Sequence, residues 1–211
     1  MIFSKIPLDE HTIRRFNATE RLLHWLNAVF YLVLLITGLA FCFPVFSPLS
    51  LGHPVVNYII HVGIGVSLGT WMILLYFFKL KKLPRSEWKQ HFSYFKSNKY
   101  NAGQKMNISV TAFLMVVFFI SGICMALGQY LPLSMLKAAF YIHNLAVMAI
   151  LPIIFGHIFL SLVFPATNRS LFAMIIGKVE EQYARHHHPE WHKEVTEHLR
   201  TKPDLNEKKT H

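Results

Sequence analysis

Two long stretches of this chain contain almost no charged residue, and they constrain its fold more than any other feature of the sequence. Residues 22–78 include no Asp, Glu, Lys or Arg, and residues 106–168 include one, Lys137. Soluble domains are about a quarter charged, whereas 15% of this chain is charged. Because one helical span needs about 20 apolar residues, each stretch is long enough for two spans. The sequence predicts an all-α membrane protein with a bundle of four transmembrane helices.

Prolines and basic residues divide the two stretches into four predicted spans. Three spans end where a proline follows, at Pro44, Pro132 and Pro165, because proline cannot continue helical hydrogen bonding. The second span ends instead at a basic segment that begins with Lys79. The predicted spans are residues 22–43, 55–78, 108–130 and 135–164.

The spans divide the chain into three parts. Residues 1–21 form an N-terminal segment, residues 22–165 form the membrane domain, and residues 166–211 are again polar. Within this last part, residues 171–181 predict a short helix at the membrane interface. The rest is rich in His, Lys and Glu and predicts a soluble tail.

The distribution of Lys and Arg predicts the orientation. Residues 79–105 contain eight basic residues and one acidic residue, and residues 1–21 contain four basic residues. The link between the first two spans, residues 44–54, contains none. Because basic residues accumulate on the cytoplasmic side of membrane proteins, we expect both termini and the middle loop in the cytoplasm. This rule explains the net charge of +10 without a nucleic-acid partner.

Four histidines lie within the predicted spans, where an ionisable residue is usually functional. By depth they form an inner pair near the cytoplasm, His24 and His157, and an outer pair, His61 and His143. His143 and His157 are fourteen residues apart, about 21 Å along a helix and within about 40° of one direction. Gly38 follows His24 by the same interval, which would leave room for a bulky group at the outer level.

Paired imidazoles at two depths indicate two haem groups. Neutral imidazole is a good iron ligand, and two imidazoles fill both axial positions of a haem, which then transfers electrons. The sequence has no Cys-x-x-Cys-His motif, so the haems would be of the non-covalent b type. The alternative is that the histidines bond neighbouring helices or relay protons in a haem-free transporter or scaffold.

A polar stretch precedes the third span on the predicted cytoplasmic side. Asn101 and Gln104 can donate hydrogen bonds to a carbonyl group, and Gly103 allows a ligand to approach the backbone. These residues favour a quinone site near the inner pair. The alternative is a turn that only begins the span.

Two cysteines and a group of C-terminal histidines complete the candidate residues. Cys42 and Cys124 lie in apolar surroundings and are expected to be small buried side chains. The tail histidines fit a solvated face that docks a partner, with a surface metal site as the alternative. They are His186, His187, His188, His192 and His198.

In these residues the sequence resembles the cytochrome b (gamma) subunit of membrane-bound, quinone-linked formate dehydrogenases. The resemblance covers nearly the whole chain, and its loop and tail motifs are the specific part. The matching residues are Glu20-Arg21 before His24-Trp25, His61, residues 100–105, His143, His157 and residues 187–191. The histidine pattern alone is shared with the cytochromes b of hydrogenases and thiosulfate reductases.

The resemblance implies that the four histidines bind two haems b in the pairs given above. It also implies a menaquinone or ubiquinone pocket near the inner haem, lined by Asn101, Gly103, Gln104 and His157. Electrons would reach the outer haem from an iron–sulfur subunit, which receives them from a molybdenum or tungsten subunit that oxidises formate. The chain itself would have no catalytic residue for formate and would lie in the bacterial cytoplasmic (inner) membrane. The alternative is the equivalent subunit of a nickel–iron hydrogenase or another molybdoenzyme.

Overall fold

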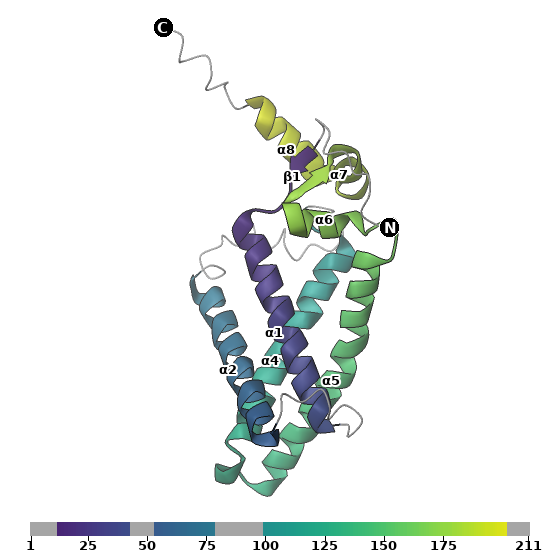
Figure 1. The fold of residues 1–211 in the computed structure, drawn as a ribbon. Helices are drawn as coiled ribbons and strands as arrows, with labels where there is room; N and C mark the ends of the chain where they lie inside the picture. The colour runs from purple at the N-terminus through teal and green to yellow at the C-terminus, as the bar shows by residue number, and fades with distance from the viewer. Residues whose placement is uncertain (1–11, 43–52, 79–98, 202–211) are drawn as a thin grey trace.

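The computed structural model describes residues 12–42, 53–78 and 99–201. Four long helices stand side by side (Figure 1), and each is long and apolar enough to cross a membrane. They are α1 (Ala18–Cys42), α2 (Pro54–Phe78), α4 (Ala102–Ala126) and α5 (Leu133–Leu162). The predicted all-α fold with four spans is therefore confirmed.

Two helices begin earlier than predicted because each starts with a capping box. At α1, Asn17 Oδ1 accepts from the Glu20 amide and the Glu20 carboxylate accepts from the Asn17 amide, both at 2.8 Å. At α4, Asn101 and Gln104 make the same reciprocal pair, at 2.9 and 3.1 Å. These bonds satisfy amides that have no partner within the helix. The helices therefore begin at residues 18 and 102 instead of 22 and 108.

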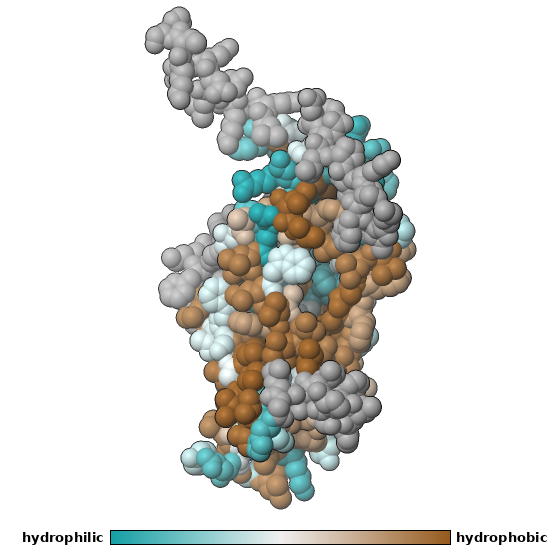
Figure 2. All heavy atoms as spheres, in the orientation of Figure 1, coloured by the Kyte–Doolittle hydropathy of each residue, from teal (hydrophilic) through white to brown (hydrophobic). Residues whose placement is uncertain are grey.

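The bundle buries little of its own apolar surface. Helix α1 packs on α2, α2 on α4, and α4 on α5, and a 3-10 turn, η3 (Gly128–Tyr130), leads from α4 towards α5. The central cluster of buried side chains consists of Leu114, Ala146 and Ile150. Many other apolar side chains remain exposed and form the hydrophobic surface between the more hydrophilic ends of the molecule (Figure 2). Lipid would cover this surface in a membrane.

A compact headpiece, residues 12–16 and 169–201, caps one end of the bundle (Figure 1). Its two short strands, β1 (Thr12–Arg14) and β2 (Lys178–Glu180), pair antiparallel. Its helices are α6 (Arg169–Ile176), α7 (Glu181–His187) and α8 (Pro189–Thr201). The buried side chains of its core are Ile13, Phe16, Ala173, Val179, Tyr183, Ala184 and Trp191.

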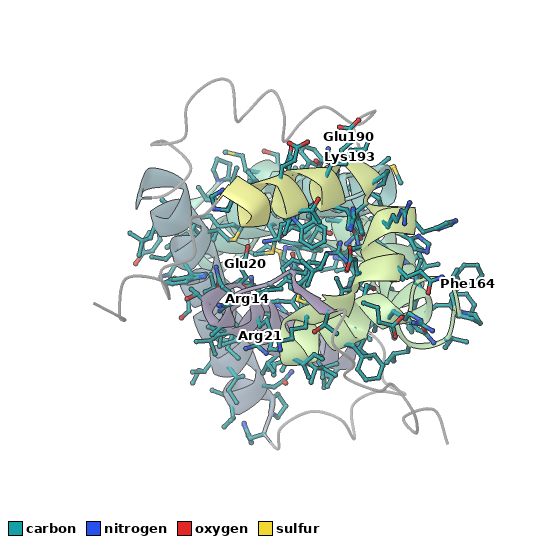
Figure 3. The ribbon with its side chains drawn as sticks, turned by 90° about the horizontal axis from the view of Figure 1, so that it is seen from above. Arg14, Glu20, Arg21, Phe164, Glu190 and Lys193 are labelled. Carbon is teal, nitrogen blue, oxygen red and sulfur yellow. The ribbon has the colours of Figure 1, made fainter. Side chains whose placement is uncertain are left out.

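The headpiece differs from the predicted interfacial helix and soluble tail. The helix predicted over residues 171–181 ends at Ile176, because Gly177 adopts the left-handed conformation with φ 84°. The chain then forms β2 and two further helices, which were not predicted. Viewed from above, α8 lies across the headpiece with Glu190 and Lys193 at its outward edge (Figure 3).

Candidate functional site

The structure brings the four span histidines together in two pairs. The ring centres of the inner pair, His24 on α1 and His157 on α5, are 6.2 Å apart. Those of the outer pair, His61 on α2 and His143 on α5, are 6.4 Å apart. These are the pairs that the depth argument predicts, and the inner pair lies nearer the headpiece. Their role as iron ligands stays a prediction.

The separation within each pair fits two ligands of one metal ion. Imidazole nitrogens bind metals at about 2.0 Å, so two rings on opposite sides of one metal have centres about 6 Å apart. Among the described residues, no three or more His, Cys, Asp or Glu side chains gather into a metal site. Two facing imidazoles suit a metal whose remaining ligands come from a porphyrin. Helix α5, which carries His143 and His157, packs closely on α4. It packs less closely on α1 and α2, which carry the partner histidines His24 and His61.

Buried hydroxyl groups hold both rings of the outer pair. Thr37 Oγ1 lies 2.7 Å from His61 Nδ1, and Ser121 Oγ lies 2.9 Å from His143 Nδ1. Each hydroxyl also donates to the carbonyl four residues earlier in its helix, at 2.7 Å for Thr37 and 2.6 Å for Ser121. A hydroxyl has one proton, so each must accept from the histidine Nδ1–H. This tautomer leaves the other nitrogen, Nε2, unprotonated and able to bind a metal.

A glycine follows each of these hydroxyl residues. A Cβ atom at Gly38 would lie 3.2 Å from His61 Cε1, and one at Gly122 would lie 3.7 Å from His143 Cε1. Gly38 was expected to make room for a bulky group, whereas its contact is with the histidine ring itself. Sequence reasoning missed Thr37, Ser121 and Gly122. The available signal was the hydroxyl–glycine dipeptide that recurs in the first and third spans.

The inner pair has a different setting. In the part of the chain that the structure describes, neither His24 nor His157 makes a hydrogen bond. The neighbouring ring of Trp25 lies edge-on to His24, with ring centres 5.5 Å apart, and its Nε1 donates to the Met174 carbonyl at 3.1 Å. This contact connects the helical turn that carries His24 to α6 of the headpiece.

The residues predicted for a quinone site form the first turn of α4. Asn101 Oδ1 and Gln104 Oε1 act as acceptors in the capping box, and Gln104 Oε1 also accepts from Arg15 Nη2 at 3.3 Å. These bonds fix the orientation of both amides, so their NH₂ groups remain as donors. Gly103 is exposed between them, and neither amide bonds His157 within the described residues.

Arg15 joins the headpiece to the start of α4. Its side chain is 3% exposed, and its Nη2 donates to the Lys99 carbonyl at 2.8 Å. Burial lowers the pKa of the guanidinium, while Tyr183 and Tyr100 oppose that shift. Lys99 also forms a salt bridge with Glu20 at 2.5 Å. The two capping boxes and the headpiece are thus tied together at one end of the bundle.

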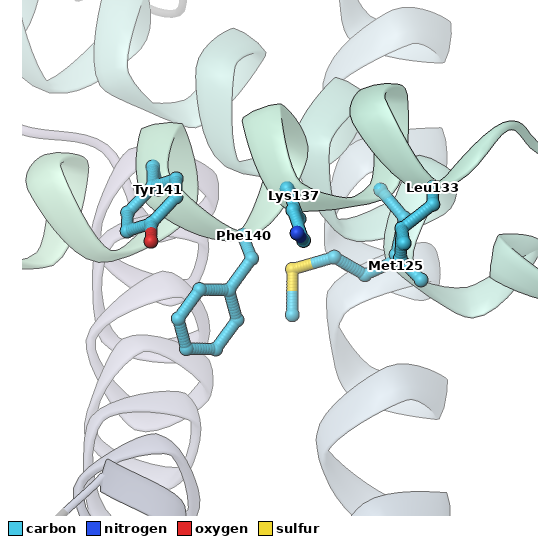
Figure 4. A pocket seen from close by; sticks show the side chains of 6 residues that line it. Met125, Leu133, Lys137, Phe140 and Tyr141 are labelled. Carbon is cyan, nitrogen blue, oxygen red and sulfur yellow. The ribbon is translucent and has the colours of Figure 1, made fainter.

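A pocket of about 330 Å³ lies at the other end of the bundle, between α4 and α5 (Figure 4). Lys137, the one charged residue of its stretch, projects among apolar and aromatic side chains there. The lining residues are Met125, Leu133, Leu136, Lys137, Phe140 and Tyr141. None of the four span histidines lines this pocket.

A membrane bundle in which facing histidines form two pairs at different depths defines the class of helical membrane cytochromes b. Comparison with known families agrees. The model of the prokaryotic cytochrome b561 family matches residues 15–177. The chain belongs to this family.

The relatives are named as subunits of one kind of enzyme. The formate dehydrogenase cytochrome b556(fdo) subunit of Escherichia coli K12 is 28% identical over 200 residues, covering 87% of this chain and 93% of the relative. The nitrate-inducible formate dehydrogenase cytochrome b556(Fdn) subunit of the same organism is 25% identical, covering 87% and 91%. The formate dehydrogenase cytochrome b556 subunit of Haemophilus influenzae is 28% identical, covering 90% and 87%.

Family membership confirms the coarser sequence predictions. The chain is a multi-pass helical protein of the bacterial cytoplasmic (inner) membrane, and as a cytochrome b it carries haem b. The resemblance drawn from its motifs agrees with the relatives found.

Proposed function

We propose that this chain is the two-haem cytochrome b subunit that anchors a formate dehydrogenase and passes electrons to quinone. One observation carries the proposal: two histidine pairs, each with the ring separation of two ligands on one metal, lie at different depths. The relatives' names supply the enzyme. Because the relatives are named as subunits, we infer that other subunits would oxidise formate and deliver electrons through iron–sulfur clusters.

The outer pair would hold one haem b and the inner pair the other. Haem iron bound by two imidazoles exchanges single electrons between its ferric and ferrous forms. The protein residues supply the ligands, and the hydroxyls of Thr37 and Ser121 keep His61 and His143 in the tautomer that binds metal. Ala146 and Ile150 lie between His143 and His157 on α5, and they pack with Leu114 of α4 in a buried apolar cluster.

Quinone would bind at the headpiece end of α4. A quinone carbonyl accepts hydrogen bonds, and the fixed amides of Asn101 and Gln104 offer NH₂ donors beside the exposed Gly103. Reduction of quinone to quinol would take two electrons, delivered one at a time through the inner site, and two protons. The Lys and Arg distribution supports a cytoplasmic headpiece, so these protons would come from the cytoplasm.

Haem counting and reduction test the function. We expect two haems b per polypeptide by the pyridine haemochrome method, reduction of both by formate in membranes, and reoxidation by quinone. A count near one, or none, contradicts the two-site proposal. Reduction by hydrogen but not by formate would assign the chain to a hydrogenase instead.

Two substitutions test the quinone site while preserving the helix cap. Asn101→Asp and Gln104→Glu keep the capping oxygens, since Asp and Glu are favoured at these positions, but they remove the NH₂ donors. We expect both haems to remain and quinone turnover to fall at least tenfold. Normal turnover in both variants would contradict this site.

The orientation is tested by labelling from each side of the membrane. In a chain with Cys42 and Cys124 replaced by serine, Lys193→Cys should react with an impermeant thiol reagent only from the cytoplasm. Ser134→Cys, at the start of α5, should react only from outside. The opposite result would reverse the proposed direction of electron transfer.

A further inference from the structure

We propose that Thr37 and Ser121 are positioning residues that lower the reduction potential of the outer haem below that of the inner haem. The inference rests on the proposed function, because it needs a haem at each histidine pair. By lowering the potential of the outer haem, the two hydroxyls would favour electron transfer from the outer to the inner site.

The hydrogen bonds of the outer pair run in one direction. Each hydroxyl proton is committed to a helix carbonyl, at 2.7 Å for Thr37 and 2.6 Å for Ser121, so its oxygen accepts from histidine. A hydroxyl that already donates is a stronger acceptor. Both hydroxyl side chains are buried, and Thr37 is fully inaccessible, so water does not compete for these bonds.

When a hydroxyl oxygen accepts a hydrogen bond from the histidine Nδ1–H, the other ring nitrogen, Nε2, becomes more basic. A more basic axial ligand stabilises ferric iron relative to ferrous iron and lowers the reduction potential. Both ligands of the outer site, His61 and His143, have this arrangement. The two contributions therefore act in the same direction on one iron.

The inner pair lacks this arrangement. Within the described residues, His24 and His157 have no hydrogen-bond acceptor. With a haem at each pair, one electron would pass from the outer site, which has the lower potential, to the inner site. No bond breaks, and the histidine protons stay in place.

A purely structural role is the alternative, in which the hydroxyls only pack against the rings. Thr37→Val and Ser121→Ala remove the acceptors, and Thr37→Ser retains one. Ser67→Ala is the control for the backbone bond, because the exposed Ser67 donates to the carbonyl four residues earlier at 2.7 Å and has no histidine partner among the described residues. The measurement is a potentiometric titration of purified protein followed by absorption and electron paramagnetic resonance.

We expect Thr37→Val and Ser121→Ala each to raise the midpoint potential of the outer haem. Loss of one hydrogen bond should increase its reduced-to-oxidised ratio at a fixed potential about fivefold. The inner haem should not shift, and Thr37→Ser and Ser67→Ala should match the unmodified protein. If only one of Thr37→Val and Ser121→Ala retains the outer haem, the midpoint potential of that haem must still be raised in the variant that retains it.

Two outcomes overturn the inference. One is an unchanged outer potential in variants that keep both haems. The other is loss of the outer haem from both Thr37→Val and Ser121→Ala, because the hydroxyls would then retain the haem and not tune it. Fewer than two haems in the unmodified protein would instead contradict the proposed function.

Discussion

The headpiece buries seven core side chains, whereas the central cluster of the much larger bundle buries three. In water, removing apolar surface from solvent stabilises the headpiece. In a membrane, lipid is as apolar as the helix surfaces, so burial drives helix association weakly. The headpiece is therefore stabilised by its own core, and the bundle by packing and hydrogen bonds between its helices.

The strongest test removes the histidines of one pair. His61→Ala or His143→Ala should lose the outer haem and keep the inner one. A haem whose iron has one histidine ligand instead of two is held weakly by the protein. His24→Ala or His157→Ala should do the reverse. Haem content by pyridine haemochrome measures the loss, and the headpiece should keep its protease resistance in all four variants. Loss of the same haem from His61→Ala and His157→Ala would disprove the pairing.

Removing a core side chain of the headpiece should have the opposite pattern. Trp191 is 7% exposed, and Trp191→Ala should destabilise the headpiece by about 3–5 kcal/mol. Proteolysis of the headpiece in membranes measures this, while the haem count should stay near two. Glu190→Ala, at an exposed neighbour, is the control. Loss of both haems with Trp191→Ala would show that the two regions fold as one unit.

A smaller effect is expected at the turn between α6 and β2. Gly177 has φ 84°, and a Cβ atom there would lie 2.7 Å from the Phe16 carbonyl oxygen. Gly177→Ala should therefore cost about 1–3 kcal/mol of headpiece stability. Lys178→Ala, at the exposed next position, should change it by less than about 0.5 kcal/mol. Equal protease resistance in the two variants would contradict the strain at Gly177.

The smallest effect is expected where the capping boxes meet. Lys99 and Glu20 form a salt bridge at 2.5 Å, with side chains 28% and 35% exposed. Lys99→Gln should destabilise the contact by at most about 1 kcal/mol, less in high salt, because such pairs are screened. Lys193→Gln, at an exposed position of α8, provides the baseline. A loss above that of Gly177→Ala would show that this pair is a main link between bundle and headpiece.

The sequence predicted the bundle because charge is excluded from lipid. The uncharged stretches at residues 22–78 and 106–168 define four helices, and the depth of the histidines defines the two pairs. The exact starts of α1 and α4 could be predicted only by also considering the capping side chains. Asn17 with Glu20, like Asn101 with Gln104, has the spacing of a capping box, which would have placed both helix starts.

Contacts between distant parts of the chain could not be predicted from the sequence. Thr37 and Ser121 look like ordinary helix hydroxyls, which commonly bond their own helix. The recurring hydroxyl–glycine dipeptide marks both positions, but it does not show that each hydroxyl meets a histidine on another helix. Strand β1 pairs Thr12 with Glu180, and strands of three residues have no reliable pattern of their own. In the headpiece, Gly177 gave a local signal for the end of α6.

His157 follows His143 by fourteen positions along α5, a rise of about 21 Å at about 1.5 Å per residue. This is about two thirds of a hydrocarbon core of about 30 Å. With the headpiece in the cytoplasm, an electron moving from the outer to the inner pair crosses most of the transmembrane voltage against its sign. At about 100 mV, negative inside, the transfer costs about 1.5 kcal/mol per electron. Electron transfer through the subunit would therefore increase the transmembrane voltage. A high voltage would in turn slow this electron transfer.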